Sequence, residues 1–276
     1  MMKQRDGAIT SAGKLLRIAL LGLSFFTLTS VPMQAQPSFP VAVTGGIHQP
    51  ESAQALFNEG LDHTEQGNLQ AAILSYTQAI EIDPTFTAAY IHRGIAYHDL
   101  DDIQQAMTDF QAALRLNPNS AEAYYGLGEA HVHLSDLVRA IAHLDRAIVL
   151  DPNYVEAYNN RGTIYAMRGD FVRALADFDR AIAINPTYPD AYYNRGKTRT
   201  EMNDAAGAIA DFTQTIRLNP TLADAYGSRG LLYFETGDRN AALTDLERAA
   251  ELFRQQNDQY SYQQTQFYLQ QIRQQP

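Results

Sequence analysis

The residues best suited to chemistry are arginines and aspartates that recur sixteen residues apart along the chain. The four combinations are Arg93 with Asp109, Arg161 with Asp177, Arg195 with Asp211, and Arg229 with Asp245. Where one partner is missing the other is missing too, as in Glu59 with Ser75 and Leu127 with His143. A guanidinium can bind a carboxylate through two parallel hydrogen bonds. We therefore expect four ion pairs of structural importance. Pairing each aspartate with the next arginine instead would place Asp109 opposite Leu127, which is a poorer match.

Other chemistry finds little support in the sequence. The absence of cysteine excludes disulfides and thiolate ligands. No two of the seven histidines stand four residues apart with a carboxylate partner nearby, which is the arrangement typical of a helical metal site. There is no nucleophile motif and no glycine-rich phosphate loop. The net charge of −10, from 21 basic and 31 acidic residues, argues against a nucleic-acid partner. We expect no catalytic residue, no metal and no cofactor.

The elements that position these residues repeat with a period of 34. Prolines follow this period at 84, 118, 152, 186 and 220, glycines at 60, 94, 128, 162, 196 and 230, and alanines at 72, 106, 140, 174, 208 and 242. We number each repeat from 1 to 34, which puts these glycines at position 8, the alanines at position 20 and the prolines at position 32. Six repeats result: 53–86, 87–120, 121–154, 155–188, 189–222 and 223–256.

Each repeat predicts two helices. In the fourth repeat, apolar residues at three- and four-residue spacing run from Phe171 to Ile182 and form the stripe of an amphipathic second helix. Asn or Asp at position 16 is a favourable N-cap for that helix, and proline at position 32 stops it. Gly67, Gly169 and Gly237 suit a left-handed helix end. Since one hairpin cannot bury its own apolar face, neighbouring hairpins must stack.

This pattern resembles the tetratricopeptide repeat family: an aromatic at position 4, small residues at 8 and 20, an aromatic at 24, alanine at 27 and proline at 32. The resemblance covers 204 of the 276 residues. It implies an all-α fold, a right-handed superhelical solenoid of six helix-turn-helix repeats with a C-terminal capping helix. The sequence departs from the family at position 7, where arginine often replaces leucine.

The resemblance also implies a concave groove lined by the first helices, with positions 2, 5, 6, 9, 12 and 13 exposed. The candidate groove residues are Asn58, Tyr125, Asn159, Asn160, Tyr193, Asn194, Lys197, Glu122, Glu156, Asp190 and Asp224. A family clamp for acidic C-terminal tails needs cations at positions 2 and 6, which this chain lacks. Asn58, Asn160 and Asn194 resemble an incomplete version of another family device, in which amides at position 6 bind the backbone of an extended peptide.

These observations favour a non-enzymatic scaffold or adaptor that binds an extended neutral or basic peptide segment in its groove. The alternative to peptide binding is that the carboxylates repeated along the groove only keep the repeat array soluble. An alternative function is a structural protein that self-associates through its C-terminal repeat. If the C-terminal tail covers the sixth repeat, assembly through that end is disfavoured.

The ends of the chain predict export and capping. Residues 1–35 combine basic residues with the uncharged run 18–31 and read as a signal peptide cleaved after Ala35, or else as an N-terminal membrane anchor. The expected location is then the bacterial periplasm or a comparable lumen. Residues 36–52 read as a linker, and the Gln-rich stretch 257–276 as a capping helix and tail. Tyr260, Phe267 and Ile272 are the expected apolar face of that helix.

Overall fold

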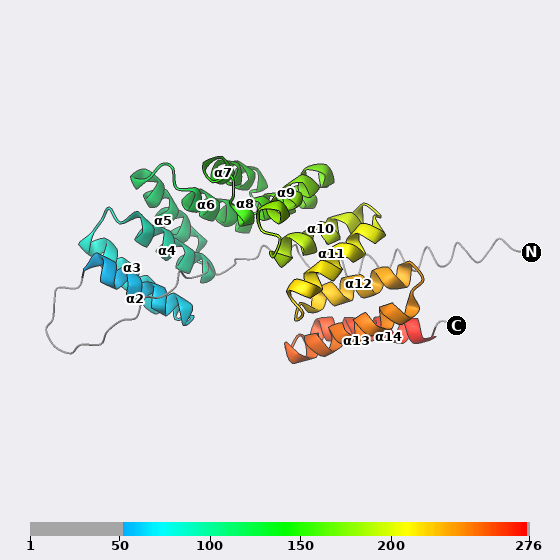
Figure 1. The fold of residues 1–276 in the computed structure, drawn as a ribbon. Helices are drawn as coiled ribbons and strands as arrows, with labels where there is room; N and C mark the ends of the chain where they lie inside the picture. Colours follow the sequence, from blue (N-terminus) through cyan, green and yellow to red (C-terminus); the bar gives the residue numbers. More distant parts are fainter. Residues whose placement is uncertain (1–51, 275–276) are drawn as a thin grey trace, which may run out of the picture. The chain divides into compact units, whose positions relative to one another are not determined.

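The computed structural model describes residues 52–274, which form thirteen α-helices and contain no β-strand (Figure 1). They divide into two compact units, an N-terminal unit of residues 52–157 and a C-terminal unit of residues 158–274, with the boundary inside one helix. The helices before the boundary are α2 (Ala53–Glu65), α3 (Leu69–Ile82), α4 (Thr87–Asp99), α5 (Ile103–Leu116), α6 (Ala121–His133) and α7 (Leu137–Leu150). Across and after it lie α8 (Val155–Met167), α9 (Phe171–Ile184), α10 (Pro189–Glu201), α11 (Ala205–Leu218), α12 (Ala223–Glu235), α13 (Arg239–Gln255) and α14 (Gln259–Gln274).

The fold is the expected all-α repeat solenoid, with six helix pairs followed by one final helix. Each repeat contributes a first helix and a second helix. The signal peptide or anchor (1–35) and nearly all of the linker (36–52) lie outside the described residues, as do the last two residues of the tail. Among the described helices, none combines the length and apolar character needed to cross a membrane.

The turn between the two helices of each pair uses the residues expected from the sequence. Asp102, Asp136, Asp170, Asp204 and Asp238 each accept a hydrogen bond from the backbone N–H three residues later. Asn68 occupies the same position but makes no side-chain cap bond. Gly67, Gly169 and Gly237 have positive φ, as predicted, and in three other turns Asp101, Ser135 and Asn203 take over the left-handed conformation.

Close contact between the two helices of a pair depends on glycine at position 8. A Cβ atom added to Gly162 would lie 2.9 Å from Cε1 of Phe178, at position 24 of the same repeat. The same close approach recurs between Gly196 and Phe212. Alanine at position 20 is fully buried in all six pairs. Small residues at these positions therefore let two helix backbones approach while the aromatic ring fills the space between them.

The arginine at position 7 and the aspartate at position 23 bind each other within each pair. The bidentate hydrogen bonds from Nε and Nη2 measure 2.8 and 2.8 Å for Arg93 with Asp109, 2.8 and 2.6 Å for Arg161 with Asp177, 3.0 and 2.6 Å for Arg195 with Asp211, and 2.7 and 2.9 Å for Arg229 with Asp245. All four aspartates are buried. Each pair therefore locks the first helix of a repeat to its own second helix.

The same arginines also reach the preceding repeat, which the sequence did not predict. Nη1 of Arg93 donates to Thr77 Oγ1 at 2.9 Å, and Nη1 of Arg229 donates to Thr213 Oγ1 at 2.9 Å. In Arg195 the same nitrogen binds Asp179 Oδ1 at 2.6 Å. All three partners occupy position 25 of the repeat before. One guanidinium thus joins three helices, which sets the register between neighbouring hairpins as well as within one.

The final helix covers the sixth pair, but with a different face from the one expected. Tyr268, Leu269 and Ile272 are buried in a cluster with Leu246 and Ala250 of α13. Tyr260 and Phe267, which the sequence assigned to the apolar face, are 54% and 53% exposed. The buried stripe of α14 includes Tyr268, Leu269 and Ile272. The helix is therefore rotated about its own axis relative to the orientation expected from the sequence.

Breaking the ion pair of the sixth repeat tests the role of the arginine. We expect Asp245→Ala to lower the free energy of unfolding by about 3–5 kcal/mol, because it leaves the Arg229 guanidinium buried without a carboxylate. The double variant Arg229→Leu/Asp245→His reproduces the pair of the third repeat, Leu127 with His143, and should recover more than half of that loss. Urea unfolding followed by circular dichroism measures both. A loss below about 1 kcal/mol for the single variant would be typical of an exposed pair and would contradict this role.

Candidate functional site

The candidate groove residues lie on the first helices of the repeats, but five of them are not exposed as expected. Asn159, Asn160, Tyr193, Asn194 and Lys197 are each at most 6% exposed. They come from α8 and α10 of the C-terminal unit. Their burial has a local cause, because the amides bond to one another instead of standing free on a surface. These residues form the best-defined polar cluster on the described first helices.

Three asparagines form a directional chain of amide hydrogen bonds. Asn194 Nδ2 donates to Asn159 Oδ1 at 3.0 Å, and Asn159 Nδ2 donates to Asn160 Oδ1 at 3.2 Å. The first of these bonds joins α10 to α8. It leaves Asn194 Oδ1 at the end of the chain, a buried acceptor with no hydrogen-bond partner. An unsatisfied buried acceptor costs free energy that a donor from another molecule would recover.

The asparagine ladder expected from the sequence is therefore only partly correct in composition. Asn160 and Asn194 belong to it, but the residue that connects them is Asn159, at position 5 instead of position 6. Asn58 lies in the other unit, is exposed, and accepts a hydrogen bond from Gln54 of its own helix at 2.9 Å. Only the packing of α10 on α8 reveals that position 5 of one repeat meets position 6 of the next.

The charged residues beside the amide chain include both signs, but the carboxylates outnumber the lysine. Lys197 Nζ lies 5.6 Å from the ring centroid of Tyr193, within range of a cation–π interaction. Burial lowers the pKa of the Lys197 ammonium to about 8, while the carboxylates of Asp224 and Glu201 act in the opposite direction. Asp190 and Asp224 occupy position 2 of α10 and α12 and are partly buried. Lys197 is thus a buried cation, not the exposed one that the sequence suggested.

In the N-terminal unit the groove candidates gather around a pair of tyrosines. Tyr125 stacks on Tyr154 with ring centroids 4.9 Å apart, and its hydroxyl donates to Glu129 Oε1 at 2.8 Å. Burial raises the pKa of the Tyr154 phenol, and the carboxylates of Glu122, Glu156 and Glu129 raise it further. The sequence named Tyr125, Glu122 and Glu156 but missed Tyr154 and Glu129. Tyr154 lies two residues after Pro152, and the same position in other repeats holds Phe86 and Tyr188. This recurring aromatic is the pattern that could have revealed Tyr154 in the sequence.

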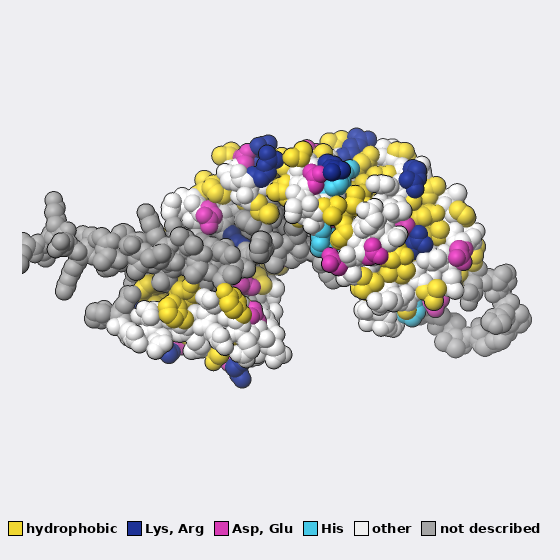
Figure 2. All heavy atoms as spheres, turned by 180° about the vertical axis from the view of Figure 1, so that it is seen from behind, with side chains coloured by type: hydrophobic (Ala, Val, Ile, Leu, Met, Phe, Trp, Pro, Cys, Tyr) yellow, Lys and Arg dark blue, Asp and Glu magenta, His cyan; other side chains and the backbone are white. Residues whose placement is uncertain are grey.

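The histidines of the described chain all belong to the N-terminal unit, and those visible in Figure 2 lie there. His131 stacks on His143 with ring centroids 5.1 Å apart, and His98 meets His133 edge to face at 4.7 Å. His92 packs between Phe57 and Tyr76. Over residues 52–274, no group of three or more metal-ligating side chains is arranged to hold an ion. His92, His131 and His143 act as packing residues, and their lowered pKa values couple their protonation to folding.

Known families match most of the repeat region. Models described as tetratricopeptide repeat match residues 92–155, 127–193, 164–227 and 223–256, and one described as TPR repeat matches residues 60–101. No curated protein matches the sequence.

Solved structures share the fold. A crystal structure of MamA is 30% identical, with a TM-score of 0.54, over 60% of this chain and 96% of that one. PilW, described as a widely conserved type IV pilus biogenesis factor, is 23% identical, with a TM-score of 0.67, over 76% and 96% of the two chains. The APC/C hetero-tetramer Cut9–Hcn1 gives 18% identity and a TM-score of 0.71 over 79% of this chain. There the match spans only 43% of the other chain's length. At such low sequence identities, PilW and Cut9–Hcn1 are similar to this chain in fold alone.

Acid should destabilise the N-terminal unit through its buried histidines. Burial lowers the pKa of His92 to about 4, below its ordinary value of 6.5, so the folded chain keeps this ring neutral while the unfolded chain protonates it. The stability that depends on neutral His92 is complete above pH 6.5 and is lost as the pH falls toward 4. We expect about 2 kcal/mol to be lost at pH 5. Burial also lowers the pKa values of His131 and His143, so they act in the same direction.

His98 opposes this trend. Burial lowers its pKa, but the carboxylates of Asp99 and Glu129 outweigh that effect and the net shift is upward. Urea unfolding at pH 7 and pH 5 measures the balance, with His92→Gln as the comparison. The variant should lose less stability on acidification than the native chain. An equal loss in both would show that His92 does not control the acid response.

Proposed function

Because the chain belongs to the tetratricopeptide repeat family, we propose that it is a non-enzymatic adaptor that binds a neutral or basic peptide segment along the first helices of its C-terminal unit. The family is one of protein-interaction scaffolds, so a protein or peptide partner is the general expectation. The specific proposal places the contact at Asn159, Asn160 and Asn194. The identity of the partner protein is not part of the proposal.

The observation that carries this proposal is the unpartnered Oδ1 atom of Asn194. The bonds from Asn194 to Asn159 and from Asn159 to Asn160 orient the three amides in one direction. The acceptor at the end of the chain has almost no exposed surface, so a donor such as a backbone N–H reaches it only when the residues that cover it move aside. A ligand that presents only acceptors, such as a carboxylate, would leave this oxygen unsatisfied.

The neighbouring charges support a neutral or basic segment over an acidic one. Asp190 and Asp224 stand at position 2 of consecutive first helices, and Glu201 acts with Asp224 on Lys197. Carboxylates outnumber the single lysine, so an acidic peptide would meet net repulsion. Lys197 moderates this field, because it partly neutralises the carboxylates beside the amide chain.

We also propose that the chain is exported, with a signal peptide removed after Ala35. The basic residues before Ile18, the uncharged run to Val31 and the small residue at position 35 support this proposal. Expression in a bacterial host followed by fractionation and N-terminal sequencing tests it. A first residue of Gln36 in the periplasmic fraction is expected. An uncut chain in the membrane fraction would support the anchor instead.

Binding is tested with peptides selected from a library of linear twelve-residue sequences against the immobilised native chain. We expect the selected peptides to be neutral or basic, and Asn194→Ala to weaken their binding about five- to tenfold, the value of one hydrogen bond. Asn240→Ala on the exposed surface of α13 is the matched control and should leave binding unchanged. Fluorescence polarisation measures the dissociation constants.

A contact through the peptide backbone can be tested with the same peptides. Each amide nitrogen of the peptide is methylated in turn. Methylation of the nitrogen that donates to Asn194 should weaken binding to the native chain about as much as Asn194→Ala does, and the Asn194→Ala variant should be insensitive to that methylation. Selected peptides that are acidic, or that bind native and Asn194→Ala chains equally well, would overturn the proposal.

A further inference from the structure

A seam of exposed neutral side chains runs along the outer face of α14. Its members are Tyr260, Gln263, Phe267, Gln270 and Gln274, which we call the α14 seam. They alternate three and four residues apart, so they lie along one side of the helix, as in a coiled coil. All five are exposed, and the two aromatics stand one heptad apart. The buried side of the helix is a different stripe, formed by Thr265, Tyr268, Leu269 and Ile272.

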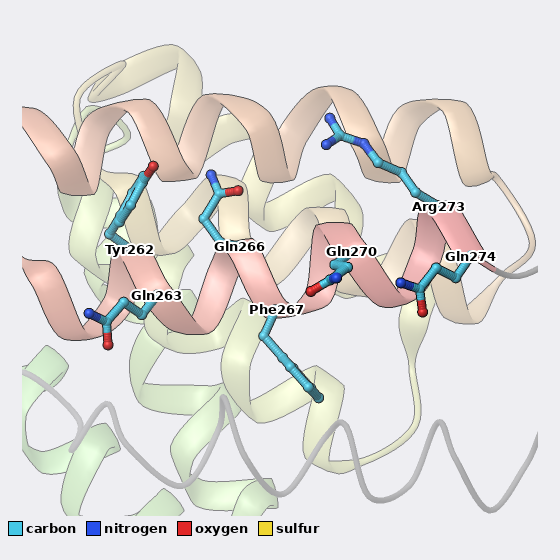
Figure 3. Close-up of a pocket in the computed structure, with 7 residues that line it drawn as sticks. All are labelled: Tyr262, Gln263, Gln266, Phe267, Gln270, Arg273 and Gln274. Atoms are coloured by element: carbon cyan, nitrogen blue, oxygen red, sulfur yellow. The ribbon is translucent and has the colours of Figure 1, made fainter.

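The seam borders a hollow on the surface. The hollow has a volume of about 630 Å³ and is lined by Tyr262, Gln263, Gln266, Phe267, Gln270, Arg273 and Gln274. Gln263, Phe267 and Gln274 point to the same side of α14 (Figure 3). Helix α14 follows the second helix of the sixth pair, where a further first helix would stand. Within residues 52–274 no second helix follows to cover it.

The absence of charge on the α14 seam indicates which binding partner fits it. Arg273 is the single charged residue of α14, and its guanidinium is ion-paired to Glu247 Oε1 at 2.6 Å. The seam itself carries no charge, although the chain as a whole has a net charge of −10. Two copies that met through acidic surfaces would repel each other, whereas two neutral seams can approach without that cost.

The chemistry of the seam is also self-complementary. A glutamine amide has both a donor and an acceptor, so a row of glutamines can pair with a second identical row. Aromatic rings in the same row add apolar contact area, and stacked pairs of them are favourable. A two-fold axis through Phe267 would place Phe267 of each copy in contact and set Gln263 opposite Gln270 of the partner copy. Such an arrangement is closed and limited to two chains.

We propose that the chain forms an antiparallel homodimer through the α14 seam. The six hairpins stay outside the interface, so peptide binding at Asn194 does not depend on it. The self-association considered from the sequence was also through the C-terminal end, and a tail that covers the sixth repeat was expected to disfavour it. Helix α14 covers that repeat, and the outer face of α14 is the contact surface.

Sedimentation equilibrium of the full chain over a range of concentrations tests the proposal. The native chain should show a monomer–dimer equilibrium. Phe267→Gln should raise the dimer dissociation constant about tenfold or more, because it removes the central aromatic contact. The double variant Gln263→Glu/Gln270→Glu should do the same, because each new glutamate then faces a glutamate of the other copy. Val172→Gln, at an exposed apolar residue of α9, is the control and should not change it.

A charge swap tests the antiparallel register. In Gln263→Glu/Gln270→Lys, each new glutamate faces a new lysine of the other copy, so dimerisation should return to the native level or exceed it. Circular dichroism confirms that each variant keeps its helical content. A native chain that stays monomeric at all concentrations overturns the proposal. A dimer indifferent to both Phe267→Gln and Gln263→Glu/Gln270→Glu also overturns it, because association would then use another face.

Discussion

A helical hairpin has an apolar face that it cannot cover by itself, and this constraint shapes the whole protein. The two helices of a hairpin approach closely because position 8 is glycine and position 20 is alanine. The aromatic ring at position 24 then fills the space between them. The remaining apolar surface requires a neighbour, so stability accumulates from one hairpin to the next. The arginine at position 7 fixes the angle of that contact, because its guanidinium binds its own repeat and, in three repeats, the one before.

Tight stacking has consequences for the polar residues of the first helices. Once α10 packs on α8, the amides of Asn194 and Asn159 are close enough to bond and are removed from water together. A buried polar group is tolerated when it is satisfied, and here one acceptor of the chain is not. Core residues normally complete such networks internally.

The two units use the same scaffold with different chemistry. The N-terminal unit carries the described histidines and the tyrosine pair with its three glutamates, and its stability falls under acid conditions because His92 is buried in its neutral form. The C-terminal unit has no histidine. It carries the amide chain and the seam of α14, and neither depends on a histidine. A peptide site and a dimer surface in this unit would keep working across a range of pH that weakens the other unit.

The sequence by itself determined the features that recur within one repeat. The period of 34 predicted the six hairpins, and the joint presence or absence of arginine and aspartate predicted the ion pairs, because a contact inside a repeat has the same spacing every time. Contacts between repeats leave a weaker pattern in the sequence, because the residue type at the contact varies: Arg93 and Arg229 meet threonine at position 25 of the repeat before, whereas Arg195 meets aspartate. The bond from Asn194 to Asn159, the reach of Arg195 to Asp179, the burial of Lys197 and the exposure of Phe267 depend on how one helix is rotated against the next. Only the tertiary structure decides that rotation, since it results from all the side chains at an interface packing at once.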